Sequence, residues 1–415
     1  MREMKPSSME WVGDIPTSWK VIPNKYLMHK KKEICPVYNG EDILSLTMKG
    51  VIVRDLDAGG KMPASFDGYQ RLESGNLLMC LFDIDVTPRC IGLIKQTGLS
   101  SPAYSQFVLC DDANAAYYCY YYTMLDNDKT LLHLAKNLRH SLTEDQLGAI
   151  PVIVPPMDEQ KRIADFLDAK CAEIDALATD IQAQIDTLEQ YKRSVITETV
   201  TKGLNPNAEM KDSGVFYMAP MNATWRLTKI GYICSKLSRS FAPEDTALIC
   251  SNKGKVQVRA DDLTGIMVSD DNAMQGIHAG DIAIHGMDTW HGAIALSEYD
   301  GKITRVVHVC DSTEDKRFIV YYMQHLAFQG VYKLISNGVR GNTSDFRSWD
   351  KVRDIWIAIP ETKEEQAAIC DYLDRQCTAV EEVIATKKEQ LEVLGEYKKS
   401  LIFEYVTGKK EVPVS

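Results

Sequence analysis

The sequence predicts a mixed α/β protein in which two globular α/β domains are separated by two long antiparallel coiled-coil helices, with an internal pseudo-twofold repeat. Three observations predict this fold: a duplication at a shift of about 206 residues, two apolar seams at helical spacing, and short strand-like runs elsewhere. The predicted order is a domain over 1–156, a helix over 157–203, a domain over 204–360 and a helix over 361–415.

The duplication is strongest in the two helical segments. It continues without a gap through three matched blocks, which are Glu159-Gln160 on Glu365-Gln366, Phe166-Leu167-Asp168 on Tyr372-Leu373-Asp374, and Tyr191–Ile196 on Tyr397–Ile402. The domains match only loosely, at Trp19 and Trp225, Gly75 and Gly280, and Tyr117-Tyr118 and Tyr321-Tyr322. The sequence therefore predicts a shared framework with diverged surfaces.

Each helical segment has start and stop signals. Pro155-Pro156 with acidic residues directly after it predicts a helix start, and Gly203 predicts its end. Apolar residues then recur at alternating steps of three and four, which is typical of a coiled-coil seam. The residues predicted to pair the helices are Ile163, Leu167, Ile174, Leu177, Ile181, Leu188, Ile369, Leu373, Val380, Val383, Leu394 and Leu401. Two ordinary core helices of one large domain are the alternative, but the narrow seams and charged outer faces favour a pair.

The two domains show short elements of both kinds. The predicted strands lie in 76–82, 149–154, 280–285 and 354–359, and the predicted helices in 115–125 and 316–328. The tyrosines of 117–122 could stack on bases. Their matching helical context in the second copy favours a core helix instead.

Charge and composition set limits on the class of protein. The net charge is −11, but residues 157–203 and 361–415 hold 14 Lys and Arg against 22 Asp and Glu, that is −8 of it. The two domains are therefore nearly neutral and can present basic faces. No leader or membrane span is recognisable, so we expect a cytoplasmic protein. The 11 cysteines form no C-x-x-C pair and are expected to be reduced thiols.

Motifs of catalysis are missing from the sequence. There is no phosphate loop, no Asn-Pro-Pro-aromatic motif and no glycine-rich cofactor loop. Glu159-Gln160-Lys161 resembles part of a nuclease signature, but its place in the first helical turn favours a structural role. His285 and His291 lack metal-ligand spacing. We therefore expect no catalytic site, no cofactor and no metal.

Taken together, these features resemble the specificity subunit of type I restriction-modification systems over essentially the whole chain. The resemblance is carried by the openings at Trp19 and Trp225, the strands at Gly75 and Gly280, the junctions Val154–Gln160 and Ile359–Gln366, and the duplicated helix ends Tyr-Lys-Arg/Lys-Ser-hydrophobic-Ile followed by Val-Thr.

The resemblance implies a non-catalytic DNA-binding subunit. Residues 1–156 and 204–360 would be target recognition domains 1 and 2, each reading one half of a bipartite, asymmetric site in double-stranded DNA. Two methyltransferase subunits would dock on the helices and perform adenine N6 methylation, and restriction motor subunits would add cleavage.

Candidate DNA contacts follow from residue chemistry. Lysine and arginine neutralise phosphates, whereas forked or amide side chains read base edges. The candidates are Lys30, Lys31, Lys32, Arg139, Lys253, Lys255, Arg259, Arg340 and Asn342. Arg139 and Arg340 stand at corresponding places, just before the last predicted strand of each domain. Solvated surface cations remain the alternative for each.

Two other functions fit the same pattern. One is the recognition subunit of a modification-only or type II-like system, which uses the same DNA chemistry without a motor. The other is a coiled-coil adaptor whose two domains bind proteins.

Overall fold

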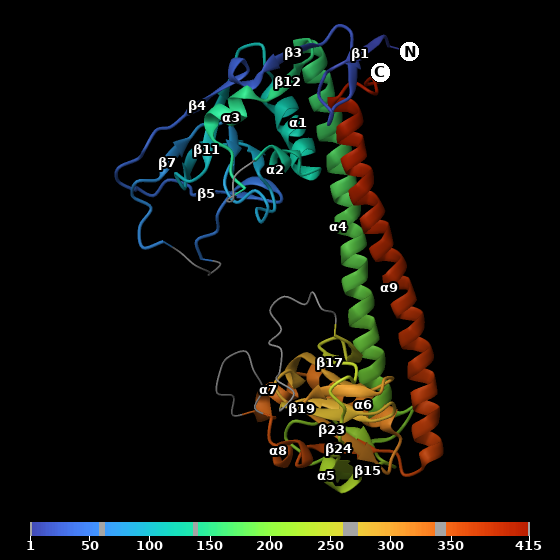
Figure 1. Cartoon of the computed structure of the whole chain (residues 1–415). Coiled ribbons are helices and arrows are strands. Elements are labelled where there is room, and N and C mark those ends of the chain that lie inside the picture. Colours follow the sequence, from blue (N-terminus) through green and yellow to red (C-terminus); the bar gives the residue numbers. More distant parts are fainter. Residues whose placement is uncertain (1, 58–62, 136–139, 260–272, 337–345, 414–415) are drawn as a thin grey trace. The chain divides into compact units, whose positions relative to one another are not determined.

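The structure is a computed structural model that describes residues 2–57, 63–135, 140–259, 273–336 and 346–413 (Figure 1). The chain divides into two compact units. Unit 1 comprises residues 1–181 and 388–415, and unit 2 comprises residues 182–387. Each unit therefore contains one α/β domain, part of the first long helix and part of the second, so the units do not follow the linear order of the chain.

Unit 1 contains a four-stranded antiparallel sheet in the order β4-β11-β8-β9 and four two-stranded sheets, β1-β2, β3-β12, β5-β6 and β7-β10. The strands are β1 (Met4–Pro6), β2 (Asp14–Pro16), β3 (Lys20–Pro23), β4 (Met28–Lys31), β5 (Leu44–Thr47), β6 (Gly50–Val53), β7 (Gln70–Leu72), β8 (Leu77–Met79), β9 (Ile91–Leu93), β10 (Gly98–Ser100), β11 (Ser105–Leu109) and β12 (Pro151–Val154).

Unit 2 repeats this set of sheets strand for strand. Its four-stranded sheet is β16-β23-β20-β21, and its two-stranded sheets are β13-β14, β15-β24, β17-β18 and β19-β22. The strands are β13 (Met210–Lys211), β14 (Met221–Asn222), β15 (Arg226–Lys229), β16 (Cys234–Lys236), β17 (Leu248–Ser251), β18 (Lys255–Val258), β19 (Met274–Ile277), β20 (Ile282–His285), β21 (Ile294–Leu296), β22 (Gly301–Thr304), β23 (Val307–Ser312) and β24 (Trp356–Ile359). The loose sequence match therefore corresponds to a full repeat of the fold.

Among the described residues the shorter helices also recur in order, except that unit 2 has η3 in addition. Unit 1 has η1 (Asn24–Tyr26), α1 (Ala115–Asn127), α2 (Thr130–Leu134) and α3 (Glu144–Ala149); unit 2 has α5 (Ile230–Ile233), η3 (Thr289–His291), α6 (Lys316–Phe328), α7 (Val331–Ile335) and α8 (Trp349–Arg353). Asn114 and Asp315 start α1 and α6 by accepting backbone N–H bonds, from Tyr117 and Arg317.

Helices α1 and α6 correct one detail of the predicted match. Both helices have 13 residues, and Tyr120 and Tyr321 stand at the sixth position of each. Tyr321-Tyr322 therefore corresponds to Tyr120-Tyr121 and not to Tyr117-Tyr118. Tyr117, Tyr118, Tyr121 and Tyr122 are at most 1% exposed, so the cluster is core, as predicted.

The long helices are α4 (Met157–Lys202) and α9 (Lys363–Val406). Each begins with two acidic residues in its first turn, which complement the positive end of the helix dipole. Gly203 and Gly408 follow the helix ends with φ of +86° and +71°, a conformation that glycine adopts without strain. Among the described residues, no helix is apolar over a length that would cross a membrane.

The two helices run antiparallel within each unit. In unit 1, Asp175 of α4 contacts Lys398 of α9 at 2.6 Å and Phe166 packs against Tyr405. In unit 2, Lys192 contacts Glu381 at 2.5 Å. Asp175 in the first half of α4 contacts Lys398 in the second half of α9, and Lys192 in the second half of α4 contacts Glu381 in the first half of α9. The two ion pairs are also related by the repeat, since 192 and 398, and 175 and 381, each differ by 206 positions.

The observed seam differs from the predicted one at two related positions. Leu177 and Val383 are 48% and 45% exposed, so their prediction as seam residues is wrong. The adjacent Ala178 is half-buried and the adjacent Ile384 is buried. One residue is about 100° of helix rotation. The pattern favoured the large Leu177 over the small Ala178, and the repeat carried the same error to Val383.

The other predicted pairing residues lie where a seam requires them. Leu188 and Leu394 are half-buried. The remaining ones are at most 9% exposed, namely Ile163, Leu167, Ile174, Ile181, Ile369, Leu373, Val380 and Leu401. The core of each unit joins its α/β domain to the start of one long helix and the end of the other.

Candidate nucleic-acid interface

Each α/β domain is held between the long helices by one buried tryptophan. The Trp19 indole donates to Glu159 at the start of α4, and the Trp225 indole donates to Glu365 at the start of α9. The turn after the other helix lies against the same ring. A Cβ on Gly408 would lie 2.9 Å from the Trp19 ring, and one on Gly203 would lie 3.3 Å from the Trp225 ring.

A buried glutamine fixes the start of each long helix. Gln160 and Gln366 are both 0% exposed. Gln160 accepts the backbone N–H of Asn114 and donates to the carbonyl of Pro155; Gln366 accepts the backbone N–H of Asp315 and donates to that of Pro360. These bonds satisfy polar groups at the junction of domain and helix. The Glu-Gln pair is therefore structural, as the sequence predicted.

A tyrosine fixes the next turn in the same way. The Tyr120 hydroxyl donates to Asp168 at 2.7 Å, and the Tyr321 hydroxyl donates to Asp374 at 2.6 Å. Burial, and then these bonds to a carboxylate, raise the pKa of both phenols. Both tyrosines therefore remain donors at neutral pH, and the two domains keep the same attachment to their helices.

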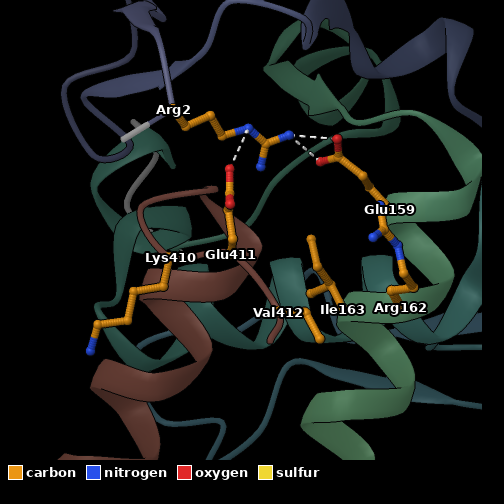
Figure 2. A pocket seen from close by; sticks show the side chains of 7 residues that line it. All are labelled: Arg2, Glu159, Arg162, Ile163, Lys410, Glu411 and Val412. Carbon is orange, nitrogen blue, oxygen red and sulfur yellow. Dashed lines mark hydrogen bonds and ion pairs between the residues drawn. The ribbon is translucent and has the colours of Figure 1, made fainter. Parts of the chain in front are cut away.

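Unit 1 has one further attachment, at its chain ends. Figure 2 shows Arg2 reaching Glu159 on one side and Glu411 on the other, above a small cavity of about 190 Å³. The Arg2 guanidinium also lies 5.4 Å from the centre of the Trp19 ring. The repeat places Ala208 at the matching position of unit 2. This contact is therefore not duplicated.

The predicted phosphate contacts of domain 1 lie on and beside one edge strand. Lys30 and Lys31 belong to β4, the edge of the four-stranded sheet, and Lys32 follows them in an exposed position. Lys30 lies 3.5 Å from Glu144, and Lys31 is paired with Glu73. Exposed pairs of this kind contribute little to stability, so phosphates can compete for both lysines.

The predicted contacts of domain 2 lie on a different element, the β17-β18 hairpin. Lys253 is exposed in the hairpin turn, and Lys255 begins β18. Lys255 pairs with Glu381 of α9 at 2.7 Å. Arg259 is half-buried at the end of the described segment. Lys255 thus joins a domain to its helix as well as carrying charge.

The predicted base readers fall outside the described residues. These are Arg139, Arg340 and Asn342. That Arg139 and Arg340 occupy corresponding places in the two domains therefore rests on the sequence alone.

Comparison of the two units adds a candidate that the sequence reading missed. Lys236 of β16 is exposed and stands where β4 has Lys30. It was overlooked because it is a single lysine outside any basic run. Aligning the two copies 206 residues apart would have found it, since 30 and 236 differ by that shift.

The helix pair exposes apolar side chains at matched places. In unit 1, Leu177 and Tyr397 are 48% and 54% exposed, and the Asp175–Lys398 contact brings them to the same level. In unit 2, Tyr191 and Val383 are 51% and 45% exposed at the level of Lys192–Glu381.

Leu177 and Val383 point away from the α/β domains. Asp175 lines a groove against domain 1, and Glu381 contacts the β17-β18 hairpin. Leu177 and Val383 follow two positions later, a rotation of about 200°. The helix pair therefore carries the same exposed apolar pair twice, once in each unit.

No metal centre is formed by the described residues. The cysteines that the structure describes are free thiols, and all but Cys110 and Cys119 are buried. Burial raises the pKa of Cys250 to about 12 and of Cys234 to about 11, so these thiols are unreactive at neutral pH. His285 pairs with Asp288, and burial lowers its pKa.

Comparisons with known proteins agree on one family. The sequence model described as "Type I restriction modification DNA specificity domain" matches residues 103–187. A protein described as a putative type I restriction enzyme MjaX specificity subunit, from Methanocaldococcus jannaschii, is 21% identical over 285 residues, 66% of this chain. The match spans 62% of that relative, less than two thirds of its length.

One solved structure shares the fold of the chain. A chain from a structure of the complex assembly and conformational transition of the type I R-M system is 14% identical, covers 95% of this chain and 99% of its own length, and has a TM-score of 0.67. The HsdS subunit from Thermoanaerobacter tengcongensis is 14% identical, with coverage of 95% and 98% and a TM-score of 0.45. Residues 103–187 are therefore similar to the DNA specificity domain of type I restriction-modification systems, and the chain shares the fold of the structure with the TM-score of 0.67, a resemblance that the duplicated motifs predicted.

Proposed function

We propose that this chain is the DNA-reading, non-catalytic subunit of a type I restriction-modification complex, in which each α/β domain reads one half of a bipartite, asymmetric sequence. The observation that carries the proposal is the duplicated attachment. Trp, Glu, Gln and Tyr hold both domains to the long helices by the same hydrogen bonds. The exposed surfaces meanwhile differ, as Lys30 to Lys32 and the β17-β18 hairpin illustrate.

Different surfaces on one framework favour two different half-sites. Sequence is read by side chains that reach base edges, while phosphate contacts fix orientation without sequence information. Lys30 and Lys236 are our candidates for shared phosphate contacts because they occupy the same strand position. Arg139, Arg340 and Asn342 remain candidates for base readout.

In this proposal the helix pair sets the length of the unread gap. Helices of 46 and 44 residues are about 65 to 70 Å long at a rise of 1.5 Å per residue. Half-sites about one turn of DNA apart face the same side of the duplex, so a fixed spacing between two reading domains becomes part of the recognised sequence.

The proposed protein partners are two methyltransferase subunits, with restriction motor subunits in addition if the complex cleaves. Two copies of one partner require two equivalent surfaces. Leu177 with Tyr397 and Val383 with Tyr191 supply an exposed apolar pair in each unit, related by the repeat. Adenine methylation itself requires base flipping and cofactor binding, which we assign to those subunits.

The test is the methylation pattern of a complex that this chain forms with a type I methyltransferase subunit. We expect methylated adenines in two unlike half-sites at a fixed gap. Four residues, about one helical turn, inserted between Ile174 and Leu188 should lengthen the gap and leave both half-sites unchanged. Altered half-sites would contradict the spacing role.

The same experiment separates the other functions. A modification-only or type II-like system would give the motif without ATP-dependent cleavage. A protein adaptor would give no sequence-specific methylation and no DNA affinity that falls steeply with salt.

A further inference from the structure

A groove of about 520 Å³ lies within unit 1, between the β5-β6 hairpin, helix α1 and the helix pair. It is lined by more cations than anions. The cations are Lys49, Arg89, Lys95, Lys398 and Lys399, and the carboxylates are Asp168 and Asp175.

Most of the charges in the groove already have partners. Arg89 donates to Asp126 and Asn127, Lys398 pairs with Asp175, and Lys399 pairs with Glu396. Tyr120 donates to Asp168. Lys49 and Lys95 are exposed, and their ammonium groups have no partner within the described part of the chain. The groove therefore has two lysines available for an external anion.

Apolar surface lies beside these two lysines. Met48 is 61% exposed and Ile52 is 41% exposed, and both line the groove with Ile402 of α9. A ligand that complements the groove needs carboxylates for Lys49 and Lys95 and apolar side chains for Met48 and Ile52. DNA phosphates supply only the first of these.

In unit 2 the corresponding positions hold larger side chains that have partners within the unit. Gln324 of α6 stands where α1 has Thr123, and it donates to the carbonyl of Ile294. Phe328, the last residue of α6, replaces Asn127 and packs under Arg193, 5.4 Å from its ring centre.

The hairpin differs in the same sense. Ser251 and Thr47 are equivalent. The hydroxyl of each donates to the backbone carbonyl of the first residue of the next strand, which is Lys255 for Ser251 and Gly50 for Thr47. Lys255 extends to Glu381, whereas Gly50 has no side chain to reach α4. Larger side chains with partners inside unit 2 thus stand at several positions that line the groove in unit 1.

We propose that the groove of unit 1 binds an acidic polypeptide segment with apolar side chains, supplied by a partner protein, at one site per chain. The net charge of −11 disfavours acidic ligands over much of the surface, whereas in this groove cations outnumber carboxylates. Unit 2 has Gln324 and Phe328 where this groove has Thr123 and Asn127, so we expect no second copy of the groove there. Its occupant therefore differs from a partner that binds both units equally.

The probe is a fluorescent peptide of about 12 residues made of Glu, Asp, Leu and Phe, titrated onto the full chain and compared with a version in which Lys replaces Glu and Asp. We expect 1:1 binding of the acidic peptide that weakens with salt. Lys49→Glu with Lys95→Glu should weaken it by about tenfold or more. Lys20→Glu with Lys363→Glu, the same charge change at exposed lysines outside the groove, should leave it within about twofold.

A second variant gives the groove the side chains of unit 2: Thr123→Gln, Asn127→Phe and Lys399→Arg. It keeps the net charge, and we expect it to lose peptide binding while retaining the wild-type helical signal and DNA affinity. Equal binding of both peptides, two sites per chain, or full binding by this variant would overturn the proposal. Loss of DNA affinity in the same variant would overturn it in favour of phosphate binding. DNA affinity is measured separately, so failure here leaves the proposed function intact.

Discussion

Units 1 and 2 share their attachments and differ in what surrounds them. The bonds of Trp19, Gln160 and Tyr120 recur at Trp225, Gln366 and Tyr321. Beside them, Met124 of α1 is replaced by His325 of α6, and Phe403 of α9 by Thr197 of α4. His325 and Thr197 form a hydrogen bond in unit 2, whereas Met124 and Phe403 belong to the apolar core of unit 1. The repeat thus preserves how a domain is held and allows the rest to change.

The largest expected effect comes from the two tryptophans. Trp19→Ala and Trp225→Ala each remove a fully buried ring and should destabilise their own unit by about 3 to 5 kcal/mol. Hydrogen exchange followed by mass spectrometry should show faster exchange in 1–156 for the first variant and in 204–360 for the second. Faster exchange in both domains from either variant would mean that the attachments are not independent.

The buried glutamines should give a smaller and matched effect. Gln160→Ala and Gln366→Ala leave a buried backbone N–H and carbonyl without partners and should each cost about 2 to 4 kcal/mol. Urea unfolding measures both. The exposed Gln182→Ala and Gln390→Ala are matched controls with effects within about 0.5 kcal/mol. A large difference between Gln160 and Gln366 would break the equivalence of the two junctions.

His325 of unit 2 should contribute to the pH dependence of the stability of the chain. Burial lowers the pKa of His325 to about 4 from an unfolded value of 6.5, so the unfolded chain takes up a proton first as the pH falls. The contribution of neutral His325 to the free energy of unfolding is therefore complete above pH 6.5 and is lost as the pH falls from 6.5 to 4. From pH 7.5 to 5, His325→Met should remove about 2 kcal/mol of this loss. An unchanged pH profile in urea unfolding would contradict this assignment. The variant also loses the hydrogen bond to Thr197, but that loss lowers the free energy of unfolding by the same amount at both pH values and leaves their difference unchanged.

The ion pairs of the helix pair should give the smallest effect. Burial alone would raise the pKa of Glu381, but Lys192 and Lys255 outweigh it and lower that pKa. Glu381→Gln should cost about 1 kcal/mol, and Asp175→Asn, which loses only Lys398, should cost less because Asp175 is 63% exposed. Thermal unfolding in low salt compares them. A larger destabilisation by Asp175→Asn than by Glu381→Gln would show that the Lys255–Glu381 ion pair adds nothing to stability.

Sequence periodicity predicted the long helices well because their signals are local. Proline, acidic residues and glycine mark the ends, and the 206-residue shift made each helix a check on the other. The same check failed at Leu177 and Val383, since both copies have a large apolar residue one position from the seam. A repeat reveals features that both copies share, but a wrong prediction for one copy is then also made for the other.

The attachment of each domain to the end of the other helix had no sequence signal. Gly408 lies against Trp19, nearly 400 positions away, and nothing local in either segment indicates it. The predicted basic residues had the opposite difficulty. Runs such as Lys30 to Lys32 are conspicuous, while the single Lys236 at the matching strand position is not. Correspondence in the fold, and not local charge density, identifies equivalent surface positions.

The central claim is that two unlike domains on one repeated framework read two unlike half-sites. It is tested most directly by a chain in which residues 204–360 are replaced by a second copy of residues 1–156, with methylation motifs mapped in the assembled complex. The account predicts an inverted repeat of the first half-site, with the second half-site absent. Persistence of the original asymmetric motif would contradict it, because the removed domain would then not have been reading DNA.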